Sequence, residues 1–281
     1  MKALLWKAIT FLPARELTFE TRNGKLTFNT HDVVLGKTLF VDREYELDVL
    51  ELVFSILSEL GYSPDPSSSI FLDVGANIGM TTTSVMKRNA FARAFAFEPD
   101  PYNYSLLIRN LEQNDLMTRV EAFNFGLSSK AQARELELST DNFGDHRIRG
   151  IEREGFFRED KRKTVHVSVK PLDSVLSDSI ARDISLIWVD IQGHEGHFFK
   201  GARETLLASC SPVLSEFWPY GLQRSGTGQD EYCRLISELF THYINLTGGR
   251  RGQLEKIASF EHWFSVFRTP REMGSFLFLR R

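Results

Sequence analysis

Residues 70–79 read Ile-Phe-Leu-Asp-Val-Gly-Ala-Asn-Ile-Gly, and this stretch decides the predicted fold. A short apolar run that ends in a glycine-rich turn predicts a buried strand followed directly by a helix. Strand and helix patterns then alternate along the rest of the chain. They predict an α/β fold with a doubly wound, mostly parallel sheet whose seven strands lie at 70–74, 94–97, 120–125, 184–189, 212–217, 243–246 and 275–279. The last strand is expected to be antiparallel.

A different pattern precedes this domain. Residues 17–41 alternate in polarity around the turn dipeptide Asn23-Gly24, which predicts a β-hairpin. Residues 45–60 carry apolar side chains at helical spacing, and residues 63–69 have the Ser, Pro and Asp content of a linker. We therefore expect an N-terminal hairpin-and-helix module at 1–66 and the main domain at 67–281.

Residues 141–163 interrupt the alternation between two β-like segments. They are mostly charged and broken by glycine, which is typical of a solvated, mobile excursion. We expect this charged segment to act as a lid that orders over the site when ligands bind.

The composition excludes several classes of protein. A formal net charge of -3 and a pI near 6.2 argue against a nucleic-acid partner. The two cysteines, Cys210 and Cys233, are too far apart for a zinc knuckle, so a reducing cytoplasm fits best. Residues 3–9 are apolar but broken by Lys7, and only this segment has the character of a membrane-touching helix.

The turn after the first strand predicts a nucleotide-cofactor site. Gly75 and Gly79 permit a tight strand-to-helix turn, and Asn77 stands where a pyrophosphate-binding loop would have glycine. Asp73 is expected to balance an ammonium group, and Glu98, nineteen positions after Gly79, to accept the ribose hydroxyls. This combination favours S-adenosylmethionine over NAD.

Asn124, near the end of the third strand, is also assigned to the cofactor site. Taken singly, Asp73 and Glu98 are each equally well explained as a helix cap or as a solvent-facing carboxylate.

With these residues in view, the chain resembles the FkbM-type S-adenosylmethionine-dependent methyltransferase family from about Asp32 onward. The resemblance is carried by blocks that match the family pattern: 73–79, 97–101, 172–173, 189–196, 201–202 and 215–219, with Tyr45-Glu46 in the preceding module. It implies a Rossmann-like methyltransferase sheet and O-methylation of a hydroxyl on a sugar, glycolipid or polyketide-like acceptor.

The resemblance also exposes a departure from the family pattern. Many members have glutamate where this chain has Gln192, and a branch that shares the glutamine also shares the residues around 142–147. Membership of that branch implies that Gln192, Asp145, His146 and Arg147 face the acceptor.

Two residues are candidates for the general base. Asp190 ends the fourth strand at the same sheet edge as Asp73, and a carboxylate there can take a hydroxyl proton. His194 is the alternative, since its unperturbed pKa lies near neutrality. Each also has a structural interpretation, Asp190 as a helix cap and His194 as a helix residue bonded to backbone.

Glu216 and Trp218, at the end of the fifth strand, are expected to line the acceptor pocket, although a packing role for the tryptophan is equally consistent with the sequence. The spacing of His194 and His197 invites a metal interpretation, but the pattern around them lacks a recognised ligand set, and we expect no metal.

Three functions therefore compete. The first is an O-methyltransferase that uses S-adenosylmethionine on a small-molecule or glycan acceptor. The second is an NAD-type oxidoreductase on a related fold, which the turn sequence disfavours. The third is a catalytically silent cofactor-binding or scaffold domain, which the presence of Asp73, Glu98 and Asp190 disfavours.

Overall fold

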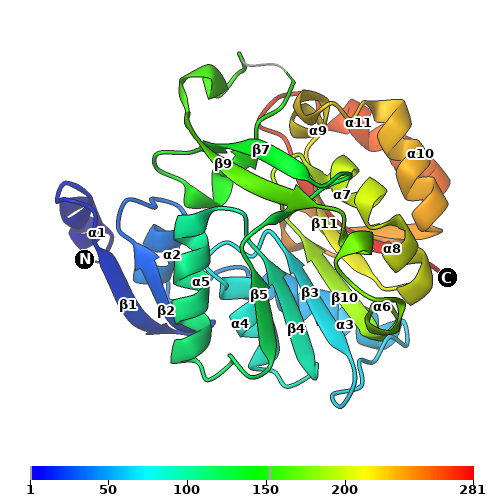
Figure 1. The fold of residues 1–281 in the computed structure, drawn as a ribbon, viewed down its shortest axis with the longest axis horizontal. Coiled ribbons are helices and arrows are strands. Elements are labelled where there is room, and N and C mark those ends of the chain that lie inside the picture. Colours follow the sequence, from blue (N-terminus) through cyan, green and yellow to red (C-terminus); the bar gives the residue numbers. More distant parts are fainter. Residues whose placement is uncertain (1, 152–153) are drawn as a thin grey trace.

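The computed structural model describes residues 2–151 and 154–281. Within these ranges the central sheet has eight strands in the order β13-β12-β14-β11-β10-β3-β4-β5 (Figure 1). The strands are β3 (Ile70–Val74), β4 (Arg93–Phe97), β5 (Val120–Phe123), β10 (Ile184–Val189), β11 (Val213–Phe217), β12 (His242–Asn245), β13 (Leu254–Lys256) and β14 (Gly274–Leu279).

The predicted sheet is confirmed, with one strand more than expected. Strands β3, β4, β5, β10 and β11 pair in parallel, and β14 inserts antiparallel between β11 and β12. The eighth strand, β13, is a three-residue edge strand that pairs with β12. Its sequence carries no apolar alternation, so its pairing follows from the neighbouring backbone and not from a pattern of its own.

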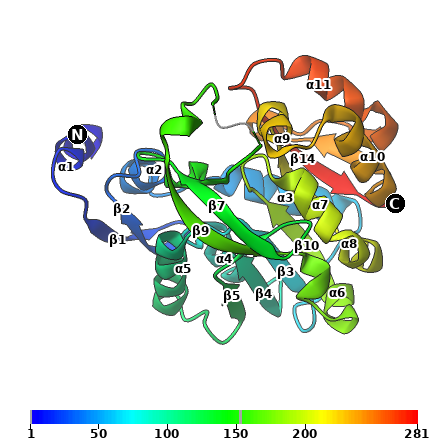
Figure 2. The same cartoon turned by 45° about the horizontal axis from the view of Figure 1, so that its top comes forward.

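Helices cover both faces of the sheet (Figure 2). On one face Leu50 and Val53 of α3 (Leu47–Glu59) share a core with Phe71 of β3, together with α4 (Met80–Met86) and α5 (Pro101–Gln113). On the other face Leu72 packs with Phe198 and the helices α7 (Glu195–Gly201), α8 (Arg203–Ser209) and α10 (Gln229–Leu239). The shorter helices are α6 (Asp178–Asp183), α9 (Pro219–Ser225) and α11 (Trp263–Val266).

The N-terminal module packs directly on the main domain. It comprises α1 (Lys2–Thr10), the hairpin β1 (Glu16–Thr21) and β2 (Gly24–Asn29), α2 (Leu35–Val41), and α3. The side chain of Asn110 in α5 accepts from the Thr27 amide at 2.7 Å and donates to the Thr27 carbonyl at 3.1 Å. Because the module shares buried residues with α5 and the sheet, the segment 63–69 acts as a tight turn between packed elements.

The chain between β5 and β10 builds a second sheet across the carboxyl ends of the first (Figure 1). Its four strands, within the described ranges, run β6-β9-β7-β8: β6 (Gly126–Leu127), β9 (Lys163–Lys170), β7 (Gln132–Leu138) and β8 (Arg147–Ile148). The charged segment predicted at 141–163 connects β7 to β9, and residues 152 and 153 of it lie outside the described residues.

The expectation of a solvated excursion holds for part of this segment, where Ile151 and Phe156 are exposed, but not for its ion-paired residues. Arg147 is 6% exposed and Glu159 is fully buried, and the two form an ion pair at 3.4 Å. Arg224 of α9 pairs with the same glutamate at 3.4 Å. The charges are removed from water because they neutralise one another, which composition alone does not reveal.

Helix α1 buries Trp6 against Phe40 and leaves Leu4 and Leu5 exposed, as is Phe11 just after the helix. Across the described ranges, every helix is too short or too polar to cross a bilayer. Contact of this helix with a membrane surface stays a prediction.

Candidate functional site

Two adjoining cavities lie where β3, β4 and β10 end. The β4-side cavity is lined by Glu98 and its neighbours, by residues 126–127, and by Phe143, Gly144, His146 and Ile148 of the chain that follows β7. The α3-side cavity is lined by Asp73, by residues 80–81 of α4 and by Tyr45 and Glu46 of the N-terminal module. The two cavities adjoin, because they share four lining residues: Gly75, Asn77, Gly144 and Asp190.

The turn after β3 lies directly against the end of β10. Gly75 has a φ of +89°, and a Cβ at this position would lie 1.9 Å from the carbonyl oxygen of Asp190. Gly79 has a φ of +78°, and its Cβ would lie 2.4 Å from a methyl carbon of Leu107. Only glycine satisfies both the left-handed backbone and the close approach, as the sequence predicted.

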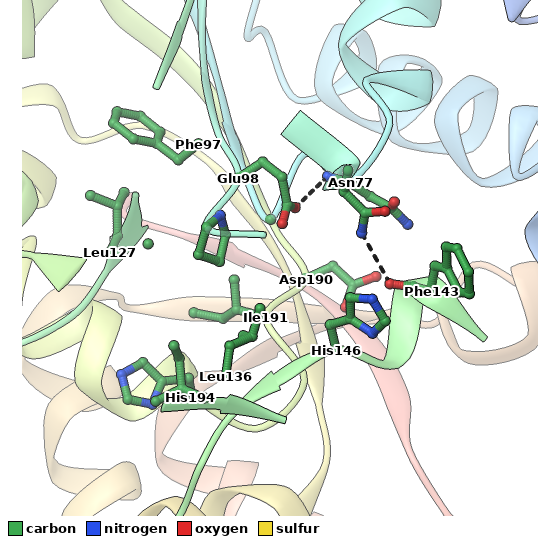
Figure 3. Close-up of a pocket in the computed structure, with 16 residues that line it drawn as sticks. Asn77, Phe97, Glu98, Leu127, Leu136, Phe143, His146, Asp190, Ile191 and His194 are labelled. Carbon is green, nitrogen blue, oxygen red and sulfur yellow. Dashed lines mark hydrogen bonds between the residues drawn. The ribbon is translucent and has the colours of Figure 1, made fainter. Parts of the chain in front are cut away.

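Glu98 is buried at the end of β4, inside the β4-side cavity (Figure 3). One carboxylate oxygen accepts the Asn77 amide at 2.8 Å and the other accepts the Asp100 amide at 2.7 Å. Burial raises the pKa of Glu98 to about 8. The carboxylate is thus held rigidly at the sheet position where this type of fold binds a ribose.

Two buried acceptor atoms in the β4-side cavity have no partner among the described residues. They are the side-chain oxygens of Asn77 and Asn103. An unsatisfied buried acceptor costs free energy unless a ligand donates to it, so these oxygens fit a cofactor that carries hydroxyl and ammonium groups. Sequence reasoning missed Asn103, whose position in the first turn of α5, after Asp100 caps the helix, is its only local signal.

Asp73 lines the α3-side cavity from the face of β3 that packs on α4. It is buried, and the hydroxyl of Thr82 donates to it at 2.5 Å. Burial raises the pKa of Asp73 to about 7. The predicted residue is therefore at the site, but one of its oxygens already has a protein partner.

Asn124 is exposed and is not among the described residues that line either cavity. Its amide donates to the carbonyls of Glu98 at 3.0 Å and of Pro99 at 3.2 Å. The structure therefore places this residue behind the Glu98 turn, where it supports the backbone of the site.

Asp190 lines both cavities and is reached by solvent through them. Partial removal from water raises the pKa of Asp190; the hydrogen bond from Gln192 opposes this shift, and the nearby charge of Asp145 adds to it. The Gln192 side-chain amide donates to Asp190 at 2.6 Å and to Glu216 at 3.1 Å. Burial, and next the charge of Asp190, raise the pKa of Glu216 well above its usual value.

His194 is placed differently from the prediction. Its two ring nitrogens lie 2.9 Å from the hydroxyls of Ser128 and Ser225, and the ring stacks on His197 at 4.4 Å. Burial, and then the neighbouring His197, hold the pKa of His194 well below its usual value. Figure 3 shows it beside Leu136 and Ile191 in the lining of the β4-side cavity, with both ring nitrogens already next to protein hydroxyls.

His146 lines the β4-side cavity from the second sheet. Its Nδ1 accepts the backbone amide of Ser139 at 3.1 Å, and burial lowers its pKa. The neutral ring must then carry its proton on Nε2. His146 is therefore a hydrogen-bond donor at the cavity and not a base.

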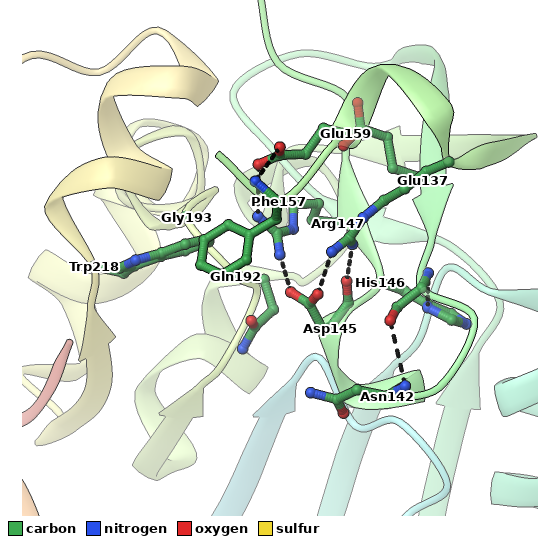
Figure 4. A network of polar contacts seen from close by, with 12 residues as sticks. Glu137, Asn142, Asp145, His146, Arg147, Phe157, Glu159, Gln192, Gly193 and Trp218 are labelled. Carbon is green, nitrogen blue, oxygen red and sulfur yellow. Dashed lines mark hydrogen bonds and ion pairs between the residues drawn. The ribbon is translucent and has the colours of Figure 1, made fainter. Parts of the chain in front are cut away.

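Asp145, Arg147 and Trp218, like Gln192 and Glu216, are not among the described residues that line the two cavities. Asp145 forms ion pairs with Arg147 and Arg162 (Figure 4). The Arg147 guanidinium lies 4.6 Å from the ring centre of Trp218, and the indole donates to the Pro270 carbonyl at 2.8 Å. Through these contacts Asp145, Arg147 and Trp218 hold the second sheet against α9, and the charges of Asp145 and Arg147 are already paired.

Across residues 2–151 and 154–281, the side chains form no group of three or more His, Cys, Asp or Glu that could hold a metal ion.

The sheet order, the antiparallel β14 and the cavity at the strand ends define the class of nucleoside-cofactor enzymes to which methyltransferases belong. A family model described as "Methyltransferase FkbM domain" matches residues 73–267. The chain belongs to the FkbM methyltransferase family and is an S-adenosylmethionine-dependent methyltransferase.

Similar proteins include methyltransferase sdnD of Sordaria araneosa, which is 30% identical over 181 residues, covering 56% of this chain and 70% of the relative. 2-O-methyltransferase NoeI of Sinorhizobium fredii is 27% identical over 154 residues, covering 51% of this chain and 60% of the relative. Among solved structures, a methyltransferase FkbM from Methylobacillus flagellatus superposes with a TM-score of 0.46 at 18% identity, covering 86% of this chain and 54% of that one.

Proposed function

We propose that the protein transfers a methyl group from S-adenosylmethionine to a hydroxyl oxygen of a sugar, glycolipid or polyketide-like acceptor. The observation that carries the proposal is the position of Asp190, whose carboxylate belongs to the walls of both cavities. A carboxylate with a raised pKa is suited to receive a proton from a hydroxyl group near neutral pH.

The chain's own residues supply binding and proton transfer. Glu98 and the free oxygens of Asn77 and Asn103 would hold the nucleoside of S-adenosylmethionine, which supplies an electrophilic methyl group when bound. Asp190 receives the proton that the acceptor hydroxyl loses as its oxygen gains the methyl carbon. Gln192 orients Asp190 through its hydrogen bond at 2.6 Å.

Phe143, Gly144 and His146, between β7 and β8, form part of the wall of the β4-side cavity and would restrict water there. Excluding water in this way favours alignment of the acceptor oxygen with the methyl group, which contributes much of the rate in a displacement reaction. The similarity to NoeI, a 2-O-methyltransferase, supports a hydroxyl acceptor.

The test is transfer of labelled methyl groups to a panel of hydroxylated glycans, glycolipids and macrolides. Wild-type protein should label at least one hydroxyl acceptor, and the product should carry an O-methyl ether by mass spectrometry. Transfer only to nitrogen or carbon nucleophiles would contradict the proposal.

A further inference from the structure

Glu46 is a carboxylate of the N-terminal module that lines the α3-side cavity together with Asp73 and Asp190. It occupies the cap position of α3 with a φ of +52°, in the left-handed region that non-glycine residues seldom adopt. Among the described residues, none forms a hydrogen bond or an ion pair with its side chain. Both carboxylate oxygens are therefore free to accept hydrogen bonds from a ligand.

The backbone beside Glu46 is held rigidly. The side chain of Asn23, buried in the hairpin turn, accepts from the Tyr45 amide and donates to the Tyr45 carbonyl, each at 2.9 Å. The same amide group donates to Ser84 of α4 at 2.9 Å. The hairpin thus connects residue 45 to the helix that follows the cofactor turn, so the position of Glu46 is defined relative to that turn.

The described lining of the α3-side cavity contains carboxylates but no cationic side chain. Glu46, Asp73 and Asp190 are its ionisable acids, and its described lining contains no Lys, Arg or His. Arg22, in the outer hollow next to Glu46, is already paired with Glu44. Glu46 itself is exposed, so its carboxylate is open to a ligand that enters the cavity.

The ammonium group of the cofactor suits the acidic lining of the α3-side cavity. S-adenosylmethionine carries its ribose in the middle and an ammonium group at the far end of its methionine part. With the ribose at Glu98 in the β4-side cavity, the α3-side cavity is the adjoining space, because the two cavities meet at Gly75 and Asn77. Asp73 is less available than Glu46 for the ammonium, since Thr82 occupies one of its oxygens.

We propose that Glu46 binds the ammonium group of S-adenosylmethionine, so that the N-terminal module completes the cofactor site. The inference rests on the proposed function for the identity of the cofactor and is independent of the acceptor. It assigns to Glu46 the part that the sequence assigned to Asp73 alone.

The test is calorimetric titration of the full chain with two ligands. S-adenosylhomocysteine keeps the ammonium group, whereas 5′-methylthioadenosine has the same nucleoside and sulfur but no amino acid part. Glu46→Gln should raise the Kd for S-adenosylhomocysteine about tenfold or more, because a charge-assisted hydrogen bond is lost. The Kd for 5′-methylthioadenosine should stay within about twofold, which also shows that the variant is folded.

Glu20→Gln is the matched control, since Glu20 is exposed on β1 in the same module and takes no part in the cavities. It should leave both Kd values unchanged. Equal weakening of both ligands by Glu46→Gln, or an unchanged Kd for S-adenosylhomocysteine with a raised KM for the acceptor, would overturn the inference. Failure to find any hydroxyl acceptor would count against the proposed function only, because the two Kd values need no acceptor.

Discussion

The side-chain amide of Gln192 joins the carboxylates of Asp190 and Glu216, at 2.6 and 3.1 Å. An amide nitrogen has two hydrogens, so it can satisfy both acids at once. A glutamate at this position would bring a third carboxylate next to two whose pKa values are already raised. In this chain, Gln192 thus avoids the repulsion between carboxylates that the glutamate of many family members would cause here.

Gln192→Glu is expected to lower turnover at pH 7 by about tenfold, because the added charge keeps Asp190 protonated. The pH dependence of kcat should shift toward alkaline pH, and turnover should recover in part there. Steady-state kinetics between pH 6 and 9 measures both effects. A profile identical to that of the wild type would contradict the role assigned to Gln192.

Asp190→Asn is expected to reduce turnover by on the order of a hundredfold or more, since it keeps the shape of the side chain but cannot accept the proton. The Kd for S-adenosylhomocysteine should remain within about threefold of the wild-type value. Single-turnover methyl transfer and calorimetry separate the two quantities. Near-normal turnover would show that alignment of the acceptor alone drives the reaction.

His194→Ala is expected to lower the thermal midpoint, because it removes two buried hydrogen bonds and leaves Ser128 and Ser225 without their partner. Turnover of the folded protein should fall only severalfold, with the shape of its pH profile unchanged. Thermal unfolding and kinetics below the midpoint test this. Complete loss of turnover in a well-folded variant would restore the histidine as the base.

Glu98→Gln is expected to weaken S-adenosylhomocysteine and 5′-methylthioadenosine alike, by about tenfold or more, because both ligands carry the ribose hydroxyls. This behaviour differs from that of Glu46→Gln, which should affect only the ligand with the ammonium group. Calorimetry with the same two ligands gives the comparison. A selective effect of Glu98→Gln on one ligand would mean that the ribose lies elsewhere.

The ligand-free protein should lose stability as the pH rises from 6.5 to 8.5. Burial raises the pKa of Asp73 and Glu195 to about 7 and that of Glu98 to about 8, above their values in the unfolded chain. The folded state therefore holds protons that the unfolded state has released, and the free energy of unfolding falls as these protons leave.

The measurement is the thermal midpoint across this pH range, with and without saturating S-adenosylhomocysteine. His194 and His197, whose pKa values are lowered, are largely neutral in the folded and the unfolded state at the upper end of the range. The change in the thermal midpoint should therefore come mainly from the acids. The stabilisation by ligand should grow with pH. A midpoint that rises between pH 6.5 and 8.5 would contradict the assignment.

The sequence by itself determined the main sheet and the position of the site on it. The run at 70–79 predicts a strand, a turn and a helix from local pattern, and Asp73, Glu98 and Asp190 each follow from their place at a strand end. Parallel strands present their carboxyl ends at one edge of the sheet, so acids far apart in the chain could be expected to meet there.

Only the tertiary structure decided how the other polar side chains are used. Whether Arg147 faces an acceptor or pairs with Glu159 depends on which partners the second sheet brings within reach. Likewise, Glu46 lines the site only because the hairpin packs on α5 and its turn holds residue 45. Burial and pairing arise from contacts between distant segments, and no local pattern of residues records them.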